Sequence, residues 1–412
     1  MSIHSDARTI IDAALGACQP DTAVRRALEG RAFSGGRVYL VAAGKAAWQM
    51  ASCAAQVLGE RLTAGVVVTK YGHSMGAISR CSIYEGGHPV PDENSFRGTE
   101  AAMALVRDLK QEDTVVFLLS GGGSALFESP LIPGEELAEV TRAMLASGAD
   151  IVEMNTVRKR LSAVKGGRFA QLCAPARVYA VVLSDILGDP LDMIASGPAC
   201  PDPTTCADAA AVAEKYHLPL SDGARRLLAV ETPKQLDNVE TVITGSVREL
   251  CAAAAEACRG LGYRPVLLTD RLCCQAKEAG SFLASIARTH EHALESLAFL
   301  AGGETVVQLT GSGLGGRNQE LALAAAPGID GMADTLIFSV GSDGTDGPTD
   351  AAGGVVDGQT MERLRRAGIS VHRTLADNDA YHALDAVGGL IRTGPTGTNV
   401  NDVAVVLLRR PV

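Results

Sequence analysis

Short aliphatic runs alternate along this chain with alanine-rich segments whose apolar positions recur every three to four residues. The first clear cycle starts with the run 38–43, passes through Gly44 and Lys45, and continues to residue 58. Within the segment 47–58, apolar side chains share one helical face and polar side chains share the other. This pattern predicts a buried strand, a glycine turn and an amphipathic helix.

Further runs of the same kind follow, and their alternation with helical segments predicts an α/β fold. Parallel strands covered by helices on both faces are continuous in apolar residues, as these runs are. The run 241–244, a helical segment 247–259 and the run 266–269 form a compact βαβ pattern. We expect mainly parallel sheets, with the remaining strands at residues 66–69, 115–119, 178–183, 305–309, 336–340 and 403–408.

The polar stretch 231–238 is the best candidate for a domain boundary, and it gives two α/β domains at residues 1–235 and 239–412. Hydrophobic residues make up 47% and charged residues 20% of the 412 positions, which excludes intrinsic disorder. The N-terminal segment lacks the features of a secretory signal, and no apolar run is long enough to span a bilayer. We expect a soluble, cytoplasmic protein whose ten cysteines are reduced.

The net charge is −10 at pH 7, from 37 basic and 47 acidic residues. No basic surplus is available to release counterions from phosphates, which argues against nucleic acid and anionic membranes as partners. Glycine is in excess, with 45 residues, and much of it lies in turns that follow predicted strands. Ligands bind at such turns in open α/β sheets, so the glycine-rich turns are the first candidates for a site.

Three consecutive glycines flanked by serines follow the predicted strand 115–119. Without Cβ atoms, their amides can approach an anion closely, and three glycines exceed what a tight turn needs. The structural alternative is a tight turn that merely requires positive φ. The residues of this turn are Ser120, Gly121, Gly122, Gly123 and Ser124.

The segment 311–316 matches the pattern G-x-G-x-x-G, and it lies between the predicted strand 305–309 and a predicted helix over 318–326. This is the context of a dinucleotide-binding fingerprint, for which Asp343 is a candidate acidic partner. A phosphate loop of another kind is equally compatible with the pattern. No Walker A motif is present, which excludes the common nucleotide-binding loop but not nucleotide use.

Two cations, Lys45 and Arg317, each occupy the first turn of a predicted helix, directly after a glycine. The helix dipole is positive at that end, so an exposed positive charge there costs about 0.3–1 kcal/mol. A bound anion would reverse the sign, because amides, dipole and cation would all attract it. The pair therefore favours anion binding over the alternative of two solvated side chains.

A polar stripe on a predicted helix contains Asn155, Arg158 and Lys165. Basic residues near a helix C-terminus are favourable for electrostatic reasons alone. A structural role and an anion-binding role therefore both stay open for this stripe.

Carboxylates cluster in two glycine- and proline-rich loops, 184–192 and 342–350. Oxygen-rich loops suit Mg²⁺, which is usually held by one or two carboxylates together with substrate phosphates. Aspartate also favours turns for its own conformational reasons. The metal candidates are Asp189 and Asp343, followed by Asp185 and Asp350.

These features favour phosphoryl transfer over hydride transfer. Phosphoryl transfer needs positioning, Mg²⁺ and cations that neutralise the transferred group. Hydride transfer would need a dinucleotide fingerprint and an acid near the carbonyl, and no histidine is conspicuously placed for that role. From the residues alone, a small-molecule kinase is the preferred interpretation.

Seven motifs occur in a fixed order, at residues 43–46, 120–124, 155–158 with 165–167, 184–189, 315–320, 341–347 and 396–399. As a set they resemble the class II glycerate kinases, also called the MOFRL family, and the resemblance covers essentially the whole chain. It implies a Rossmann-like N-terminal domain, a C-terminal MOFRL domain and an active site in the cleft between them. It also implies ATP, Mg²⁺ and D-glycerate as reactants, with 2-phosphoglycerate as product.

The resemblance further implies that Lys45 and Arg317 are catalytic, stabilising the transferring phosphoryl group and orienting the glycerate carboxylate. An aspartate of the loop 184–192 or 342–350 would hold Mg²⁺ or draw the proton from the 2-hydroxyl. The residues expected to bind substrate or nucleotide are Gly44, Ser120, Gly121, Gly122, Gly123, Ser124, Asn155, Arg158, Lys165, Gly313, Gly315, Gly316, Asn318, Thr398 and Asn399.

Two alternatives from other function classes stay open. The first is an NAD(P)H-dependent hydroxypyruvate reductase that would use the segment 311–316. The second is a non-catalytic sensor of anions or sugar phosphates, against which the two carboxylate loops count. The sequence is silent on oligomeric state, so a homo-oligomer is compatible with it, and the choice of the 2-hydroxyl rests on the resemblance alone.

Overall fold

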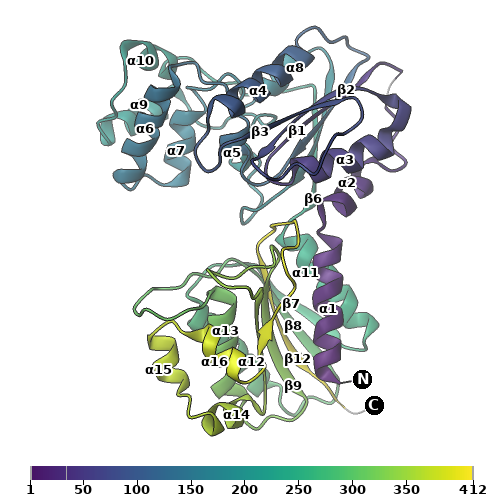
Figure 1. Ribbon diagram of the computed structural model, residues 1–412, viewed down its shortest axis with the longest axis vertical. Helices are drawn as coiled ribbons and strands as arrows, with labels where there is room; N and C mark the ends of the chain where they lie inside the picture. The colour runs from purple at the N-terminus through teal and green to yellow at the C-terminus, as the bar shows by residue number, and fades with distance from the viewer. Residues whose placement is uncertain (1, 34, 411–412) are drawn as a thin grey trace. The chain divides into compact units, whose positions relative to one another are not determined.

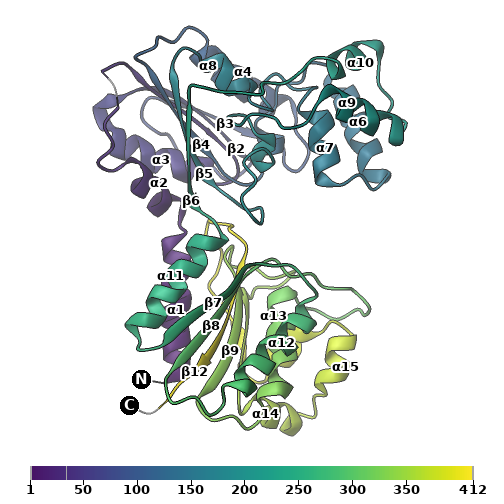
Figure 2. The ribbon, with the colours of Figure 1, turned by 180° about the vertical axis from the view of Figure 1, so that it is seen from behind.

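The computed structural model describes residues 2–33 and 35–410, and the chain forms two compact units (Figure 1, Figure 2). Residues Ala23–Thr244 form the first, which we call the central unit. Residues Met1–Thr22 and Gly245–Val412 form the second, which we call the terminal unit because it contains both ends of the chain. Each unit has one six-stranded sheet with helices packed against it, so the predicted α/β class is confirmed.

The strands of the central unit are β1 (Val38–Ala43), β2 (Leu62–Lys70), β3 (Cys81–Gly86), β4 (Thr114–Leu119), β5 (Arg177–Leu183) and β6 (Val239–Gly245). They form a sheet in the order β3-β2-β1-β4-β5-β6. The neighbouring pairs from β3 to β5 are parallel, so the carboxyl ends of these five strands share one edge of the sheet. β1 and β4 are buried along their whole length, which explains their continuous apolar runs.

The helices that pack on or beside this sheet are α2 (Pro20–Leu28), α3 (Ala47–Leu58), α4 (Glu93–Val106), α5 (Gly123–Leu126), α6 (Gly134–Ala146), α7 (Ile151–Arg158), α8 (Arg168–Cys173), α9 (Cys206–Lys215) and α10 (Asp222–Leu228). Successive residues of β1 point to opposite faces of the sheet. Leu40 and Ala42 join the core formed with α2 and α3, whereas Val41 and Ala43 join the core formed with α4 and α8. Helices α6, α7, α9 and α10 share a further apolar cluster beside the sheet (Figure 1).

The strands of the terminal unit are β7 (Arg264–Leu272), β8 (Leu297–Gly303), β9 (Thr335–Gly341), β10 (Gly353–Asp357), β11 (Leu390–Ile391) and β12 (Asp402–Leu408), in the order β11-β10-β9-β12-β8-β7. β7 and β8 are parallel, and every other neighbouring pair is antiparallel. This sheet therefore differs from the mainly parallel one that was predicted. The proposed βαβ pattern also fails, because β6 and β7 belong to different sheets.

The helices of the terminal unit are α1 (Ile3–Ala17), α11 (Val247–Gly260), α12 (Ala276–Thr289), α13 (Arg317–Ala325), α14 (Thr360–Arg366), α15 (Val371–Ala376) and α16 (Ala380–Ala386). Helices α12 and α13 pack against each other and contribute to the main core of the unit, while α1 and α11 form a second packed pair (Figure 2). In the described part of the chain, no helix is both long enough and apolar enough to cross a membrane.

Helix α1 accounts for the difference between the compact units and the predicted ranges 1–235 and 239–412. Its buried face contains Ile10, Ile11 and Ala14, and it packs on α11 rather than on the central unit. Asp6 on the same helix is buried and accepts a hydrogen bond of 2.8 Å from the Tyr263 hydroxyl. The N-terminal residues thus fold with the C-terminal half, a long-range contact that no local pattern reveals.

Candidate functional site

In the central unit, the loops that follow β1 and β4 meet at the carboxyl edge of the sheet. The two strands are adjacent and parallel, with Ala43 opposite Leu119. The Lys45 amide donates to the Gly121 carbonyl at 2.9 Å, and the Ser120 amide donates to the Ala43 carbonyl at 3.0 Å. The sheet therefore brings together Lys45 and the turn 120–124, two features that the sequence placed 75 positions apart.

Glycine is required in both of these loops, because neighbouring atoms occupy the space that a Cβ would take. A Cβ on Gly44, whose φ is +124°, would lie 2.2 Å from the Ser120 Oγ, which accepts a hydrogen bond from the Ala46 amide at 3.1 Å. A Cβ on Gly122, whose φ is +84°, would lie 3.0 Å from the His88 ring and 3.1 Å from the Lys45 side chain. Both glycines thus permit a close approach as well as a left-handed backbone.

The amides of residues 121–124 have no acceptor among the described residues. A run of unsatisfied backbone N–H groups in a turn with a left-handed residue is an anion-binding arrangement. We call the turn 120–124 the anion turn.

Two cations near the anion turn lack the carboxylate partners that such side chains normally have. The partly buried Lys45 ammonium has no hydrogen-bond or ion-pair partner within the described chain. Arg158, at the end of α7, reaches only the Ser124 carbonyl, at 3.4 Å, and its buried Nε has no partner among the described residues. Burial lowers the pKa of the Arg158 guanidinium, and the charge of Glu128 offsets only part of this effect. A desolvated cation of this kind is costly unless an anion joins it.

Asn155 and Lys165 lie behind the anion turn rather than at its surface. The Asn155 Oδ1 accepts from the Ser196 Oγ at 2.8 Å, and Ser196 in turn lies 3.1 Å from the Ser124 Oγ. Lys165 is fully buried and paired with Glu128 at 2.5 Å, and burial lowers its pKa to about 8. Because α7 ends at Arg158, Lys165 is not on the same helix as Asn155, contrary to the predicted stripe. Asn155 is thus connected to the turn through Ser196, whereas the second partner of Lys165 is the Phe127 carbonyl after α5, at 3.2 Å.

Histidine and lysine residues after β2 and β3 also lie near the anion turn, and the sequence analysis missed them. Lys70 ends β2, the His73 Nδ1 lies 3.0 Å from the Lys45 carbonyl oxygen, and His88 follows β3. Burial lowers the pKa of His88, and the charges of Lys45, Lys70 and His73 lower it further. Each of these residues lies at or after the end of a strand, and this position could have indicated them. β3 itself was not predicted, because it is half-exposed and its polar sequence does not look like a strand.

Two metal candidates of the loop after β5 fit a role in binding Mg²⁺. Asp189 has a positive φ of 56°, and its buried Oδ1 has no hydrogen-bond partner among the described residues. Asp185 lies directly against the anion turn, since a Cβ on Gly121 would fall 2.2 Å from its Oδ2. No group of three or more potential metal ligands occurs in the described residues. Mg²⁺ needs only one or two carboxylates when phosphates and water complete its shell, so these residues fit.

In the terminal unit, Arg317 is held by two carboxylates. Its Nε and Nη2 form a bidentate pair with Asp402, at 2.6 and 3.0 Å, and its Nη1 lies 2.8 Å from Glu304. Burial raises the pKa of Asp402 to about 6, although Arg317 opposes the shift. The misplaced charge inferred from the sequence is therefore balanced by the protein itself, and of the two partners Glu304 is the more exposed, at 43% of its side chain.

The G-x-G-x-x-G segment does not form a phosphate cradle. The amides of residues 310–314 donate to Asp377, Asn378 and Asp379, which follow α15. The predicted strand 305–309 is also absent, so the segment does not begin at a strand end. The dinucleotide interpretation is therefore wrong.

The glycines of this segment make room for neighbouring chain. A Cβ on Gly313 would lie 2.4 Å from Asp379, and one on Gly316 would lie 2.3 Å from Asp346. A Cβ on Gly315 would meet tight contacts of 3.3 Å with the backbone of Asn378 and Ala380. Asn318, at the start of α13, is 1% exposed, and its side chain bonds to Ser339 and Asp346. The Asn318 side chain is therefore bonded within the terminal unit, while a role of these four positions in binding a ligand stays a prediction.

The remaining candidates lie in two joined loops of the terminal unit. The Thr396 amide donates to the Asp343 carbonyl at 3.2 Å, which ties the loop 396–401 to the loop 342–350. Asn399 is exposed, and the buried Thr398 Oγ1 has no partner in the part of the chain described. Asp350 is exposed, with one oxygen bonded to Tyr381 at 2.7 Å and the other to Arg392 at 3.2 Å.

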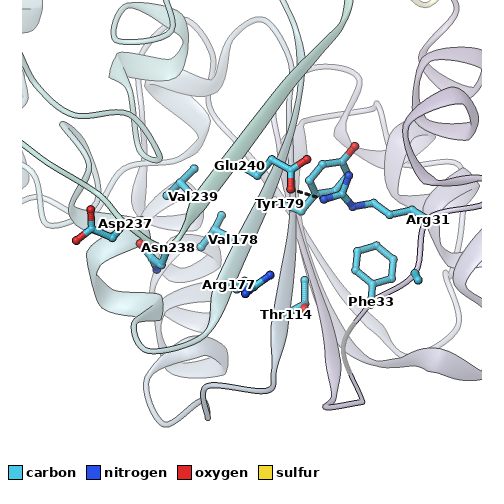
Figure 3. Close-up of a pocket in the computed structure, with 11 residues that line it drawn as sticks. Arg31, Phe33, Thr114, Arg177, Val178, Tyr179, Asp237, Asn238, Val239 and Glu240 are labelled. Carbon is cyan, nitrogen blue, oxygen red and sulfur yellow. Dashed lines mark hydrogen bonds and ion pairs between the residues drawn. The ribbon is translucent and has the colours of Figure 1, made fainter.

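A cavity of about 220 Å³ lies at the opposite end of the central sheet (Figure 3). Thr114 and Arg177, at the amino ends of β4 and β5, line it, so it is separate from the anion turn. Arg31 stacks 3.6 Å above the Tyr179 ring and is paired with Glu240. The cavity's polar groups are thus largely engaged with one another.

Two family models match the chain. The first, described as a domain of unknown function (DUF4147), matches residues 6–229, and the second, described as the MOFRL family, matches residues 297–402. A D-glycerate 2-kinase from Thermotoga maritima is 50% identical over 99% of both chains, and a glycerate 2-kinase from Pyrococcus horikoshii is 39% identical over 99% of this chain and 98% of its own. A crystal structure of glycerate kinase from Thermotoga maritima, 50% identical, matches 98% of this chain and 99% of its own with a TM-score of 0.94.

Proposed function

The chain belongs to the glycerate kinase family that carries the MOFRL domain, and from this membership we propose that it is a glycerate 2-kinase. The proposed reaction transfers the γ-phosphoryl group of ATP to the 2-hydroxyl of D-glycerate. The observation that carries the proposal is the anion turn, with its unsatisfied amides beside the unpaired cations Lys45 and Arg158. The proposal places the enzyme in the cytoplasm, where ATP is available.

The chain's own groups supply the positioning and charge that phosphoryl transfer requires. Amides of the anion turn bind phosphate oxygens, while Lys45 and Arg158 balance the charge of the transferring group. Preorganised donors of this kind need no rearrangement as charge develops in the transition state. The Arg158 guanidinium is already desolvated and therefore gains strongly from an anionic ligand.

Asp189 and Asp185 are the residues that would hold Mg²⁺ in this unit. The metal, when bound, neutralises phosphate charge and helps to orient the γ-phosphoryl group. The orphaned Oδ1 of Asp189 and the contact of Asp185 with the anion turn support this assignment. Asp343 of the terminal unit stays a weaker metal candidate, because its Oδ1 already accepts from the Thr345 amide at 3.0 Å.

Arg317 is the proposed partner of the glycerate carboxylate. Its bond to Asp402 fixes the guanidinium plane, and the carboxylate of the substrate would replace Glu304 at Nη1. A planar guanidinium recognises a carboxylate through paired N–H groups, which suits a substrate that carries one. Asn399, exposed in the neighbouring loop, is a further proposed contact for this substrate.

Phosphorus NMR of the reaction mixture tests the proposed function, including the position of phosphorylation. Purified protein is incubated with ATP, Mg²⁺ and D-glycerate, and the product signal is compared with authentic 2- and 3-phosphoglycerate. We expect 2-phosphoglycerate that forms only when all three reactants are present. Formation of 3-phosphoglycerate would refute the 2-kinase assignment, and NADH loss with hydroxypyruvate but no ATP-dependent product would favour the reductase alternative.

A further inference from the structure

His88 has a position in the central unit that neither its sequence context nor the proposed roles of other residues explain. It follows β3, and its ring lies against the anion turn: a Cβ on Gly122 would fall 3.0 Å from the ring Cδ2 and 3.2 Å from Nε2. The same Cβ would lie 3.1 Å from Cγ of Lys45. One ring nitrogen of His88 therefore lies where Lys45 and the amides of residues 121–124 meet.

The charges that shift the pKa of His88 are cationic. Two carboxylates lie against neighbouring glycines, Asp92 against Gly87 and Asp185 against Gly121. The charged and titratable groups that act on His88 are Lys45 from the turn after β1, Lys70 from the end of β2, and His73 from the loop that leads to β3. None of these is a carboxylate, and neither ring nitrogen of His88 has a hydrogen-bond partner among the described residues. Burial first, and then these cations, lower the pKa of His88, so its imidazole is neutral at neutral pH and able to accept a proton.

We propose that His88 is a catalytic residue, the acceptor of the proton that leaves the attacking hydroxyl of the substrate. The proposal rests on the proposed kinase function and adds a proton acceptor to it. In this step the hydroxyl oxygen forms a bond to the γ-phosphorus of ATP, and its proton passes to a ring nitrogen of His88. The bond between the γ-phosphorus and the bridging oxygen breaks, and its electron pair leaves with ADP.

This assignment separates the tasks of the ionisable groups around the anion turn. Asp185 and Asp189 would hold the metal, Lys45 and Arg158 would balance phosphate charge, and His88 would accept the proton. An imidazole kept neutral by neighbouring cations is ready for proton transfer before the reaction begins. After the transfer, the imidazolium lies beside a product that carries a new phosphate charge, which favours the charged form.

The test compares the pH profiles of kcat and kcat/KM for the wild-type enzyme and the His88→Gln variant, because kcat/KM reports the pKa values of the free enzyme. Glutamine keeps the approximate size and hydrogen-bonding capacity of the side chain but cannot accept the proton. We expect kcat to fall by at least about 100-fold in His88→Gln. We also expect the wild-type decline in kcat/KM on acidification, at a pH below the ordinary histidine value of 6.5, to be absent from the variant.

A second variant, Lys70→Met, tests the same proposal without altering the proton acceptor. Removing the charge of Lys70 raises the pKa of His88, so the acidic decline in kcat/KM should move to higher pH while the plateau persists. His217→Gln, which changes an exposed histidine between α9 and α10, is the matched control and should leave the profile unchanged.

Two results would overturn the role of His88 alone: a plateau kcat in His88→Gln within about threefold of wild type, or a variant that keeps the acidic decline. An unmoved decline in Lys70→Met would also contradict it. Failure of the wild-type enzyme itself to phosphorylate glycerate would instead overturn the proposed function, so the two failures are distinguishable.

Discussion

Gly122 and Gly148 both have φ angles in the left-handed region, at +84° and +73°. A Cβ on Gly148 would meet no atom within 4 Å, whereas a Cβ on Gly122 would crowd His88 and Lys45 at 3.0 and 3.1 Å. The two positions therefore separate the cost of backbone strain from the consequence of crowding the anion turn. Gly148 lies in the same unit, in the connection between α6 and α7, away from the proposed site.

The Gly122→Ala and Gly148→Ala variants should each lose about 1 kcal/mol of unfolding free energy, because each places a Cβ in a left-handed conformation. Only Gly122→Ala should lose activity as well, by about tenfold or more in kcat/KM, because it displaces Lys45 and His88. Urea unfolding and steady-state kinetics measure the two effects. Equal activity in the two variants would show that the geometry of the anion turn is unimportant for turnover.

The dipole argument singled out Lys45 and Arg317, and the structure gives the two residues different surroundings. Lys45 has no partner among the described residues, whereas Arg317 is bound to Asp402, 85 positions away in the sequence. A local pattern identifies a charge at a helix start but cannot identify a partner that the fold brings from elsewhere. The same reason explains why His88 and the unpaired state of Arg158 were not foreseen.

At the scale of elements, the start of α13 shows two helix N-terminal amides satisfied from within the chain. The buried Asp346 accepts from the Asn318 and Gln319 amides at 3.1 and 2.8 Å. Gly316 permits this contact, since its Cβ would lie 2.3 Å from the Asp346 carboxyl carbon. The carboxylate occupies the place that the sequence analysis gave to a phosphate.

Removing this cap should destabilise the terminal unit. We expect Asp346→Ala to cost about 2 kcal/mol, because two buried amides lose their acceptor. Ser246→Ala, at the start of α11 in the same unit, removes an oxygen that caps one amide and should cost about 1 kcal/mol. Urea unfolding of the full-length variants compares the two, and a loss in Asp346→Ala no larger than in Ser246→Ala would contradict this role.

The strands that were predicted best, such as β1, β4, β9 and β12, are buried on both faces, although the equally buried β8 was missed. The half-exposed edge strand β3 was missed because its polar residues break the apolar pattern. The run 305–309 failed for the opposite reason. It has the composition of a strand, but Val306 and Leu309 are 53% and 80% exposed, so burial did not support local propensity.

At the scale of the whole molecule, the sequence predicted the fold class and the family. It did not predict which segments of the chain form each compact unit. Continuous apolar runs specify buried strands locally, whereas the packing of α1 on α11 joins residues far apart in the chain. The net charge of −10 is less informative, because it argues against polyanionic partners without excluding a small anionic substrate. Within this acidic chain, Lys45 and Arg158 supply the positive charge that such a substrate needs.

The most direct test of the account is the ATP-dependent phosphorylation of D-glycerate by Lys45→Met, measured as kcat/KM beside wild type. Lys110→Met, which removes an exposed lysine before β4, is the matched control. The account predicts a fall of about 100- to 1,000-fold for Lys45→Met and a change of less than about threefold for Lys110→Met. A Lys45→Met enzyme that is folded and retains wild-type kcat/KM would contradict the assignment of the anion turn as the site of phosphoryl transfer.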